Sequence, residues 1–283
     1  MNILVLASEY PYEKDTNADR TKVVGYFARE WVKQGHKVMA IVDSSTFPAA
    51  YYIISDKVKG FVTKTFDVSR TPNRLWTKRF CYNDYGVHVE NIPIVKYIPH
   101  GRFSKKALDY QLRQITSILN DNRFIPDLVI GHWVNPQIML VPVISRNYNA
   151  KSAFVFHADY GKDICKKFNV QTYLDQIDHI GFRSQSALEV AKKYLRFKEE
   201  PFIAASGIPD AFIDKVNDNN KKIFGDTISI ITAGRLVEYK KIDVALSAAV
   251  KAFSDSRYDF IVAGDGPMKS KLQNYIDEMN QRK

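Results

Sequence analysis

Short apolar segments alternate with segments of helical spacing along most of this chain. The strand-like runs lie at 3–8, 37–42, 127–133, 152–158, 178–184 and 201–206, and helices are expected at 20–35, 136–148, 163–168 and 185–196. Chains that alternate in this way form a mostly parallel sheet covered by helices on both faces. The pattern therefore predicts an α/β fold with one doubly wound, Rossmann-like domain in the N-terminal part.

Residues 50–106 interrupt this rhythm. They combine aromatic, basic and proline-containing pieces, which fit short strands or loops, and a helix is expected around 104–121. The sequence leaves these assignments open.

A second domain begins after a polar stretch. Residues 214–227 are rich in Asn and Lys, and two further strand and helix units follow from 228 onward. We predict an N-terminal domain over 1–206, a hinge or linker over 207–226 and part of a C-terminal domain over 227–283. Open sheets commonly carry four to six strands, so the two strands expected here represent the incomplete start of a second Rossmann-like domain.

Composition excludes several classes of protein. The hydrophobic fraction of 45% and the charged fraction of 25% are typical of a soluble globular protein. No run of eighteen apolar residues suggests a transmembrane helix, and the N-terminus does not resemble a signal peptide. The two cysteines, Cys81 and Cys165, lie far apart without a metal-binding motif. These features favour a cytoplasmic protein.

The formal charge of +10 is unevenly distributed. Residues 56–106 hold eleven Lys and Arg residues against four acidic residues. Within that segment, 74-RLWTKRFCY-82 interleaves aromatic and basic side chains, which suits the interface of an anionic membrane. The segment therefore suggests a protein peripheral at the inner face of the plasma membrane; the alternative is a solvated basic face without a partner.

Candidate functional residues lie where strands end. In open α/β sheets, ligands bind beyond the carboxyl ends of the strands. Glycines there admit a close ligand, and Arg or Lys pairs with phosphate oxygens. In the second domain these residues are Gly234, Arg235, Lys240, Gly264 and Gly266; in the first they are His132 and His157. Each also has a structural explanation, as a turn glycine or as a partly buried histidine.

The pair ITAGRLVEYKKIDVALSAA and FIVAGDGPMKSKL resembles the nucleotide-binding domain of retaining GT-B glycosyltransferases of the large family 4 type, the glycosyl transferases group 1. Arg235 and Lys240 match that family's Gly-Arg-Leu and following Lys, whereas Lys241 occupies the usual glycine. Upstream, 127-DLVIGHW-133, 154-FVFHADYGKD-163 and 206-SGIPDAFI-213 resemble the family's two histidine-ending strands and its hinge, with Ser206 in place of the common Asn.

The resemblance implies transfer of a sugar from a nucleotide-diphosphate sugar, with retention, to a cell-surface glycan or a lipid-linked acceptor. Arg235 and Lys240 would neutralise the diphosphate without a metal ion or cofactor, and the sequence contains no Asp-x-Asp. His157 would hydrogen-bond the donor sugar, and His132 would lie nearer the acceptor. The family's first loop usually carries glycines, but residues 9–20 contain none. Its Glu-x7-Glu segment would lie well beyond Pro267, so we expect the chain as given to be truncated and inactive.

Other functions remain as alternatives. A nucleotide-sugar epimerase would use the same architecture, although it offers no reason for the spacing of Arg235 and Lys240. A catalytically silent transferase homologue acting as a binding module is the rival outside enzymes. A Rossmann dehydrogenase is disfavoured because no Gly-x-Gly-x-x-Gly follows the first strand. A nucleic-acid partner is not expected, since no recognised nucleic-acid module is visible.

Overall fold

The computed structural model describes residues 1–15, 21–65, 74–98, 101–158, 161–208, 213, 228–252 and 258–281. It divides the chain into two compact units, Met1–Pro209 and Asp210–Lys283. The predicted linker over 207–226 lies almost entirely outside the described residues, so its bounds stay a prediction.

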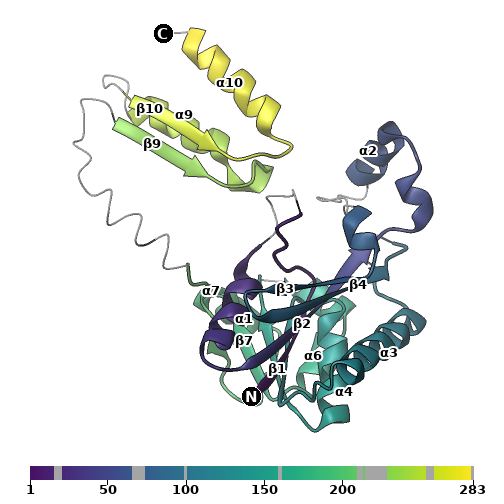
Figure 1. Ribbon diagram of the computed structural model, residues 1–283. Helices are drawn as coiled ribbons and strands as arrows, with labels where there is room; N and C mark the ends of the chain where they lie inside the picture. The colour runs from purple at the N-terminus through teal and green to yellow at the C-terminus, as the bar shows by residue number, and fades with distance from the viewer. Residues whose placement is uncertain are drawn as a thin grey trace. The chain divides into compact units, whose positions relative to one another are not determined.

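The first unit is built on one eight-stranded sheet, in the order β3-β4-β2-β1-β5-β6-β7-β8 (Figure 1). Its strands are β1 (Asn2–Ala7), β2 (Lys37–Thr46), β3 (Phe80–Asp84), β4 (Val87–Val95), β5 (Leu128–His132), β6 (Lys151–Phe156), β7 (His179–Phe182) and β8 (Phe202–Ile203). Every pairing is parallel except that of β3 with β4. The predicted doubly wound architecture is therefore confirmed.

Helices cover both faces of this sheet. The helices of this unit are α1 (Val23–Lys33), α2 (Asp56–Thr65), α3 (Lys105–Asp121), α4 (Gln137–Tyr148), α5 (Gly161–Lys167), α6 (Val170–Leu174) and α7 (Gln185–Ala191), with single 3₁₀ turns at η1 (Ala49–Tyr52) and η2 (Arg74–Thr77). Of these, α2 extends away from the sheet (Figure 1). Along β1, Leu4 and Leu6 belong to the core beneath α3 to α7, whereas Ile3 and Val5 belong to the core on the side of α1. This alternation follows from the two-residue period of a strand buried on both faces.

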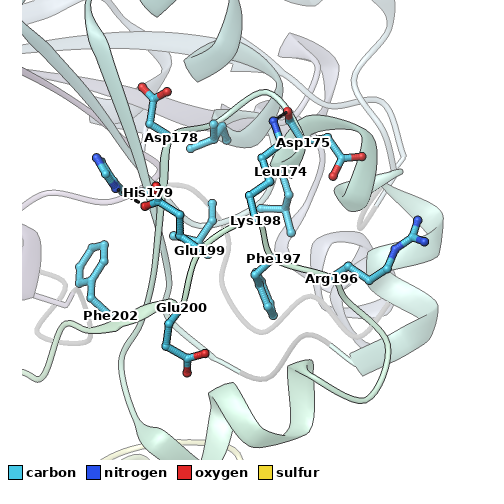
Figure 2. Close-up of a pocket in the computed structure, with 12 residues that line it drawn as sticks. Leu174, Asp175, Asp178, His179, Arg196, Phe197, Lys198, Glu199, Glu200 and Phe202 are labelled. Carbon is cyan, nitrogen blue, oxygen red and sulfur yellow. Dashed lines mark hydrogen bonds and ion pairs between the residues drawn. The ribbon is translucent and has the colours of Figure 1, made fainter.

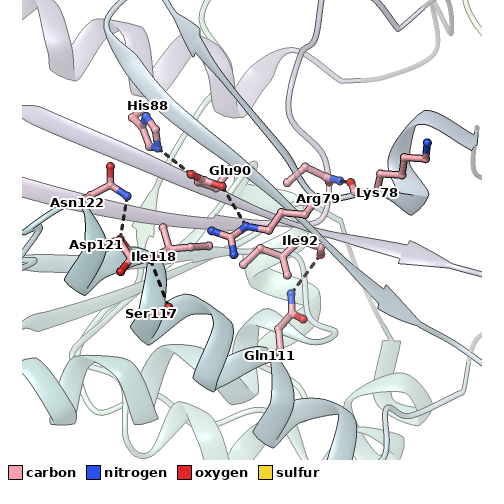
Figure 3. A network of polar contacts seen from close by, with 11 residues as sticks. Lys78, Arg79, His88, Glu90, Ile92, Gln111, Ser117, Ile118, Asp121 and Asn122 are labelled. Carbon is pink, nitrogen blue, oxygen red and sulfur yellow. Dashed lines mark hydrogen bonds and ion pairs between the residues drawn. The ribbon is translucent and has the colours of Figure 1, made fainter.

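The segment that sequence left open contains an antiparallel hairpin. β3 and β4 are joined at Tyr85 and Gly86, with φ angles of 50° and 91°. Two consecutive positive φ values are characteristic of the tight turn that matches the twist of paired strands. The hairpin puts β4 beside β2 and carries a cluster in which buried Glu90 accepts from His88 and pairs with Arg79 at 3.6 Å (Figure 3).

Trp76 corrects the prediction that aromatic side chains of 74–82 face a membrane. Its side chain is 0% exposed and packs in the core on the α1 side, while its indole N–H donates to Asp15 at 2.8 Å. Phe80 is half-buried and lies 5.4 Å from Trp76, centroid to centroid. Trp76 and Phe80 therefore stabilise the hairpin, because packing inside the unit removes their apolar surface from water.

The second unit contains a small parallel sheet. Its described elements are β9 (Ile228–Ala233), η3 (Glu238–Lys240), α9 (Ile242–Ala252), β10 (Tyr258–Ala263) and α10 (Lys269–Gln281). Leu236, Leu246 and Leu272 form its core with Phe260 and Val262. The opposite sheet face carries Ile231 and Ile261, which are paired in register and exposed.

Candidate active site

Three polar side chains leave neighbouring strands of the first unit at the same edge. His132 is the last residue of β5, His157 follows β6, and Arg183 follows β7. Phe156 pairs with Phe182 in register, so His157 and Arg183 emerge side by side. This carboxyl edge is where doubly wound sheets bind their ligands.

The three side chains form a linear chain of contacts. His132 Nδ1 lies 2.9 Å from His157 Nε2, and His157 Nδ1 lies 3.5 Å from a terminal nitrogen of Arg183. Because a guanidinium only donates, His157 accepts through Nδ1, and its Nε2 therefore carries the proton donated to His132. That leaves the remaining proton of His132 on Nε2, a buried atom with no hydrogen-bond partner among the described residues.

Burial keeps both imidazoles neutral. Loss of solvation lowers the pKa of His157 to about 3, and the charge of Arg183 acts in the same direction. The pKa of His132 falls well below its ordinary value for the same reason, with further contributions from His157 and Arg183. A neutral imidazole can donate and accept hydrogen bonds without placing a second positive charge beside Arg183.

Aromatic rings fix the orientation of this group. The indole of Trp133 stacks on the ring of His157 with centroids 4.2 Å apart and planes 17° apart. Trp133 has a φ of 66°, an uncommon value for a residue with a side chain. Phe27 of α1 stacks on His132 and lies 5.6 Å from the guanidinium of Arg183. Residues of α1 and of three strand ends thus hold one polar cluster.

A buried carboxyl lies under the neighbouring strand ends. Asp43 of β2 accepts from Gln111 at 2.6 Å and from Gln137 at 3.1 Å, and the Ser8 hydroxyl donates to Gln137 Oε1 at 3.0 Å. Burial raises the pKa of Asp43 to about 7, although the two amide hydrogen bonds oppose the rise. This network ties β2 to α3, to the first residue of α4 and to the end of β1.

In the second unit, the predicted glycines lie where two loops meet. Gly234 donates to the carbonyl of Ala263 at 2.9 Å. A β-carbon on Gly264 would lie 1.9 Å from the carbonyl oxygen of Gly234, and one on Gly266 would lie 2.5 Å from that of Leu236. Gly264 and Gly266 are therefore required for the close packing of the loops after β9 and β10. A phosphate contact from these glycines stays a prediction.

The basic residues of the second unit follow β9. Arg235 is half-buried, whereas Lys240 is exposed at the end of η3 with its ammonium 5.6 Å from the Tyr239 ring. Among the described residues, Lys240 forms no ion pair. Lys241 adopts a left-handed conformation with a φ of 52°. This conformation explains why glycine suits that position, since glycine alone adopts it without steric cost.

Sequence reasoning missed Arg183, Trp133 and Phe27. Arg183 occupies a strand end, the same signal that selected the histidines, but position alone does not show that its side chain turns toward His157. His132 was predicted on the acceptor side and has no exposed surface. Direct contact with an acceptor stays a prediction, and it requires the side chains covering His132 to move.

A small cavity elsewhere in the first unit does not belong to this cluster. It measures about 30 Å³ and is lined by residues that include Asp178, His179 and Glu199 (Figure 2). His179 begins β7, so the cavity lies at the amino end of that strand, opposite Arg183. Its volume suits a water molecule rather than a sugar. In the described part of the chain, no group of three or more His, Cys, Asp or Glu residues is arranged to hold a metal ion.

Solved structures identify the fold, whereas sequence comparisons identify no relative. No protein-family model matches this chain, and no curated protein matches it. The apo structure of OtsA is 11% identical, with a TM-score of 0.58, over 100% of this chain and 70% of that one. An alpha,alpha-trehalose-phosphate synthase (UDP-forming) from Burkholderia xenovorans, in complex with glucose-6-phosphate, is 12% identical, with a TM-score of 0.58, over 99% and 72%.

A third match is the alpha,alpha-trehalose 6-phosphate synthase from Burkholderia multivorans. It is 10% identical, with a TM-score of 0.57, over 99% of this chain and 68% of that one. At such low identity the likeness establishes the fold alone. The chain has the α/β fold of the GT-B type, as the resemblance in sequence predicted.

Proposed function

We propose that this protein is a glycosyltransferase that moves a sugar from a nucleotide-diphosphate sugar to an acceptor, with retention at the anomeric carbon. The observation that carries the proposal is the arrangement after β9. Arg235 and Lys240 follow β9, and the loop after β9 packs closely against the glycine-containing loop after β10. The GT-B fold supports the proposal as an analogy, because fold alone does not establish function.

In the proposed reaction, the bond between the anomeric carbon and the diphosphate oxygen breaks, an acceptor hydroxyl oxygen forms the new bond, and the proton of that hydroxyl passes to the departing diphosphate. Negative charge accumulates on the departing diphosphate. Arg235 and Lys240 stabilise that charge as preorganised cations, which lowers the barrier only if they are in place before the bond breaks. This role requires no proton transfer from either side chain.

The histidine cluster supplies the neutral hydrogen-bonding groups of the proposed enzyme. His157 binds a hydroxyl of the donor sugar through Nδ1, replacing its long contact of 3.5 Å with Arg183. His132 holds the opposite nitrogen of the same ring, so it acts as a positioning residue. A neutral imidazole suits this task because it can accept a hydrogen bond from a sugar hydroxyl.

Substitution of the two cations tests the proposal. With the whole protein and a panel of UDP-, GDP- and ADP-sugars, Arg235→Ala and Lys240→Ala are each expected to reduce transfer by roughly 10²–10³-fold. Lys241→Gly is the matched control, because it removes a neighbouring charge and adopts the same backbone conformation without strain. Unchanged kinetics of both alanine variants at saturating donor would remove the diphosphate role. Retention is checked from the anomeric configuration of the product.

The same assay separates the two alternatives. An epimerase would convert the sugar nucleotide without an acceptor, and a silent binding module would bind the donor without turnover. Donor consumption that depends on an acceptor supports transfer over both.

We further propose that the acceptor is lipid-linked and that the first unit binds an anionic membrane through α2. That helix extends away from the sheet of the first unit (Figure 1). Phe61 and Val58 are 70% and 47% exposed on α2, and Ile53, just before it, is 80% exposed. Lys57 is also exposed on this helix. Exposed apolar side chains beside lysines favour the boundary between lipid headgroups and acyl chains. Arg79 is a poorer candidate, because it pairs with buried Glu90.

Cosedimentation with vesicles tests the membrane proposal. Binding to phosphatidylglycerol vesicles is expected to fall for Phe61→Ser and for Lys57→Glu, and to weaken as salt screens the attraction. Ile125→Ser is the matched control, since Ile125 is 65% exposed just before β5, away from α2 in the sequence. Equal binding to neutral and anionic vesicles, or equal losses in the control, would support a solvated basic face instead. The structure adds that none of the described helices is long and apolar enough to cross a membrane.

A further inference from the structure

Arg183 is a half-buried cation for which the described part of the chain supplies no acidic partner. Among the described residues no carboxylate forms an ion pair with it, and its Nε is buried without a hydrogen-bond partner. Its polar side-chain contact is the one of 3.5 Å with His157, and its guanidinium lies 5.6 Å from the ring centroid of Phe27. A guanidinium has five N–H donors, and the described residues use few of them.

Arg29 of the same unit shows the usual arrangement. Its Nε and a terminal nitrogen donate to the two carboxylate oxygens of Asp84 at 2.8 Å and 2.6 Å. Such paired contacts balance the loss of hydration when an arginine is partly buried. No described residue supplies this balance for Arg183, which lies at the carboxyl edge where open α/β sheets bind ligands. The absence is informative because burial of a charge is costly unless a partner supplies the opposite charge.

The described side chains that contact Arg183 or its histidine neighbour are uncharged. His157 and His132 are neutral, and Trp133 and Phe27 form apolar walls beside them. An anion entering here would meet one fixed cation in a weakly polar surrounding, where attraction is stronger than in bulk water. The diphosphate of the proposed donor already has Arg235 and Lys240, so Arg183 is available to a different anionic group.

We propose that Arg183 binds a phosphate or carboxylate group of the acceptor, which makes the acceptor an anionic molecule. Both oxyanions present two oxygens at a spacing that accepts paired N–H donors from one guanidinium. The assignment of that anion to an acceptor rests on the proposed function. The anion site itself does not, because it can be tested without turnover.

The first experiment measures anion binding to the full chain. Inorganic phosphate, and separately acetate, is added while NMR follows the ring signals of His157 and the indole signal of Trp133, with chloride holding ionic strength constant. Saturable shifts of both signals are expected with at least one anion. Arg183→Gln is expected to weaken binding roughly tenfold to a hundredfold, the loss of a charged hydrogen-bond pair.

Two variants make this result specific. Arg183→Lys keeps the charge but loses the paired donors, so intermediate binding is expected. Arg146→Gln removes an equal charge from an exposed arginine of α4 that contacts Gln176, and it should bind like the wild type. If Arg183→Gln does not fold, Arg183→Lys still decides the question. Absence of saturable shifts, or equal binding in the wild type and in both Arg183 variants, would overturn the anion site.

The second experiment identifies the source of the anion. In the transfer assay, Arg183→Gln should raise KM for phosphate- or carboxylate-bearing acceptors and leave KM for their neutral analogues unchanged. Phosphate binding without any transfer would contradict the proposed function and keep the anion site. If Arg183→Gln reduced transfer equally for neutral and anionic acceptors, the assignment of the bound anion to the acceptor would be contradicted.

Discussion

The rings of His132 and His157 are joined by a hydrogen bond of 2.9 Å between Nδ1 and Nε2. His132 is fully buried, and His157 is half-buried at the strand edge. The buried ring therefore fixes the orientation of the accessible one. This arrangement assigns the two histidines different tasks, although each ends or follows a strand in the same way.

Substitution of the two histidines should separate these tasks. His157→Ala is expected to reduce transfer by roughly 10²-fold or more, because it removes the group that we propose binds the sugar. His132→Ala should cost less and should also lower stability, since it opens a cavity beside Phe27. Steady-state kinetics and thermal unfolding of both variants check the distinction. A larger kinetic loss in a stably folded His132→Ala protein would assign the contact to His132 instead.

The pH dependence of transfer provides a further check on His157. Its pKa is lowered to about 3 by burial and by Arg183, so the ring stays neutral throughout the range from pH 5 to pH 8. The ratio of wild-type to His157→Ala activity should therefore remain constant across that range. An inflection near the ordinary histidine pKa of about 6.5 would show that the ring titrates during function.

Asp43 should make the protein less stable as pH rises. Burial raises its pKa from 3.8 to about 7 in the folded protein. Between these values the unfolded chain has released the proton that the folded chain still holds. The free energy of unfolding therefore falls from about pH 4 to about pH 7, by about 1.4 kcal/mol for each unit of pKa difference, and is level above.

Asp43→Asn isolates this contribution. The carbonyl oxygen of the new amide can still accept from Gln111. If the Gln137 amide turns over, its oxygen accepts from the new NH₂ group and its own NH₂ group donates to the Ser8 hydroxyl. Urea unfolding at several pH values should show the wild type losing stability relative to the variant as pH rises. A difference that does not change with pH would mean that Asp43 is ionised in the folded protein throughout.

Asp84 should be important for the stability of the first unit. It accepts both hydrogen bonds from Arg29 and a third from the Tyr10 hydroxyl at 3.1 Å. Asp84→Ala leaves a partly buried guanidinium without its partner, at an expected cost of about 3 kcal/mol or more. Adding Arg29→Met should recover part of that loss. Urea unfolding measures both, with exposed Glu30→Ala expected to change stability by less than about 0.5 kcal/mol.

Gly264→Ala should loosen the second unit. Its β-carbon would overlap the carbonyl oxygen of Gly234 at 1.9 Å, so the loops after β9 and β10 must separate. Hydrogen exchange of the β9 and β10 amides is expected to accelerate, with little change in the first unit. Gly60→Ala is the control, because a β-carbon there meets nothing within 4 Å. Unchanged exchange in Gly264→Ala would show that these loops tolerate the separation.

Hydrophobic periodicity determined much of the architecture in advance. Apolar runs such as 3–8 encode a strand that is buried on both faces. The predicted helix around 104–121 is α3, and Ser104 caps it by accepting a hydrogen bond from the Ala107 amide. The sequence also placed His132 and His157 at the carboxyl ends of two strands. These features depend on neighbours in sequence or on a regular repeat, so the sequence carries them directly.

Tertiary packing decided the features that depend on distant contacts. The burial of Trp76 and the pairing of β4 with β2 both join residues that lie far apart in the chain, and no local pattern specifies them. Arg183 is ordinary as a residue in sequence; its contacts with His157 and Phe27 make it distinctive. The sequence determined which residues reach the edge of the sheet, whereas folding decided which of them remain charged there, because a pKa depends on burial and on neighbours brought together only in space.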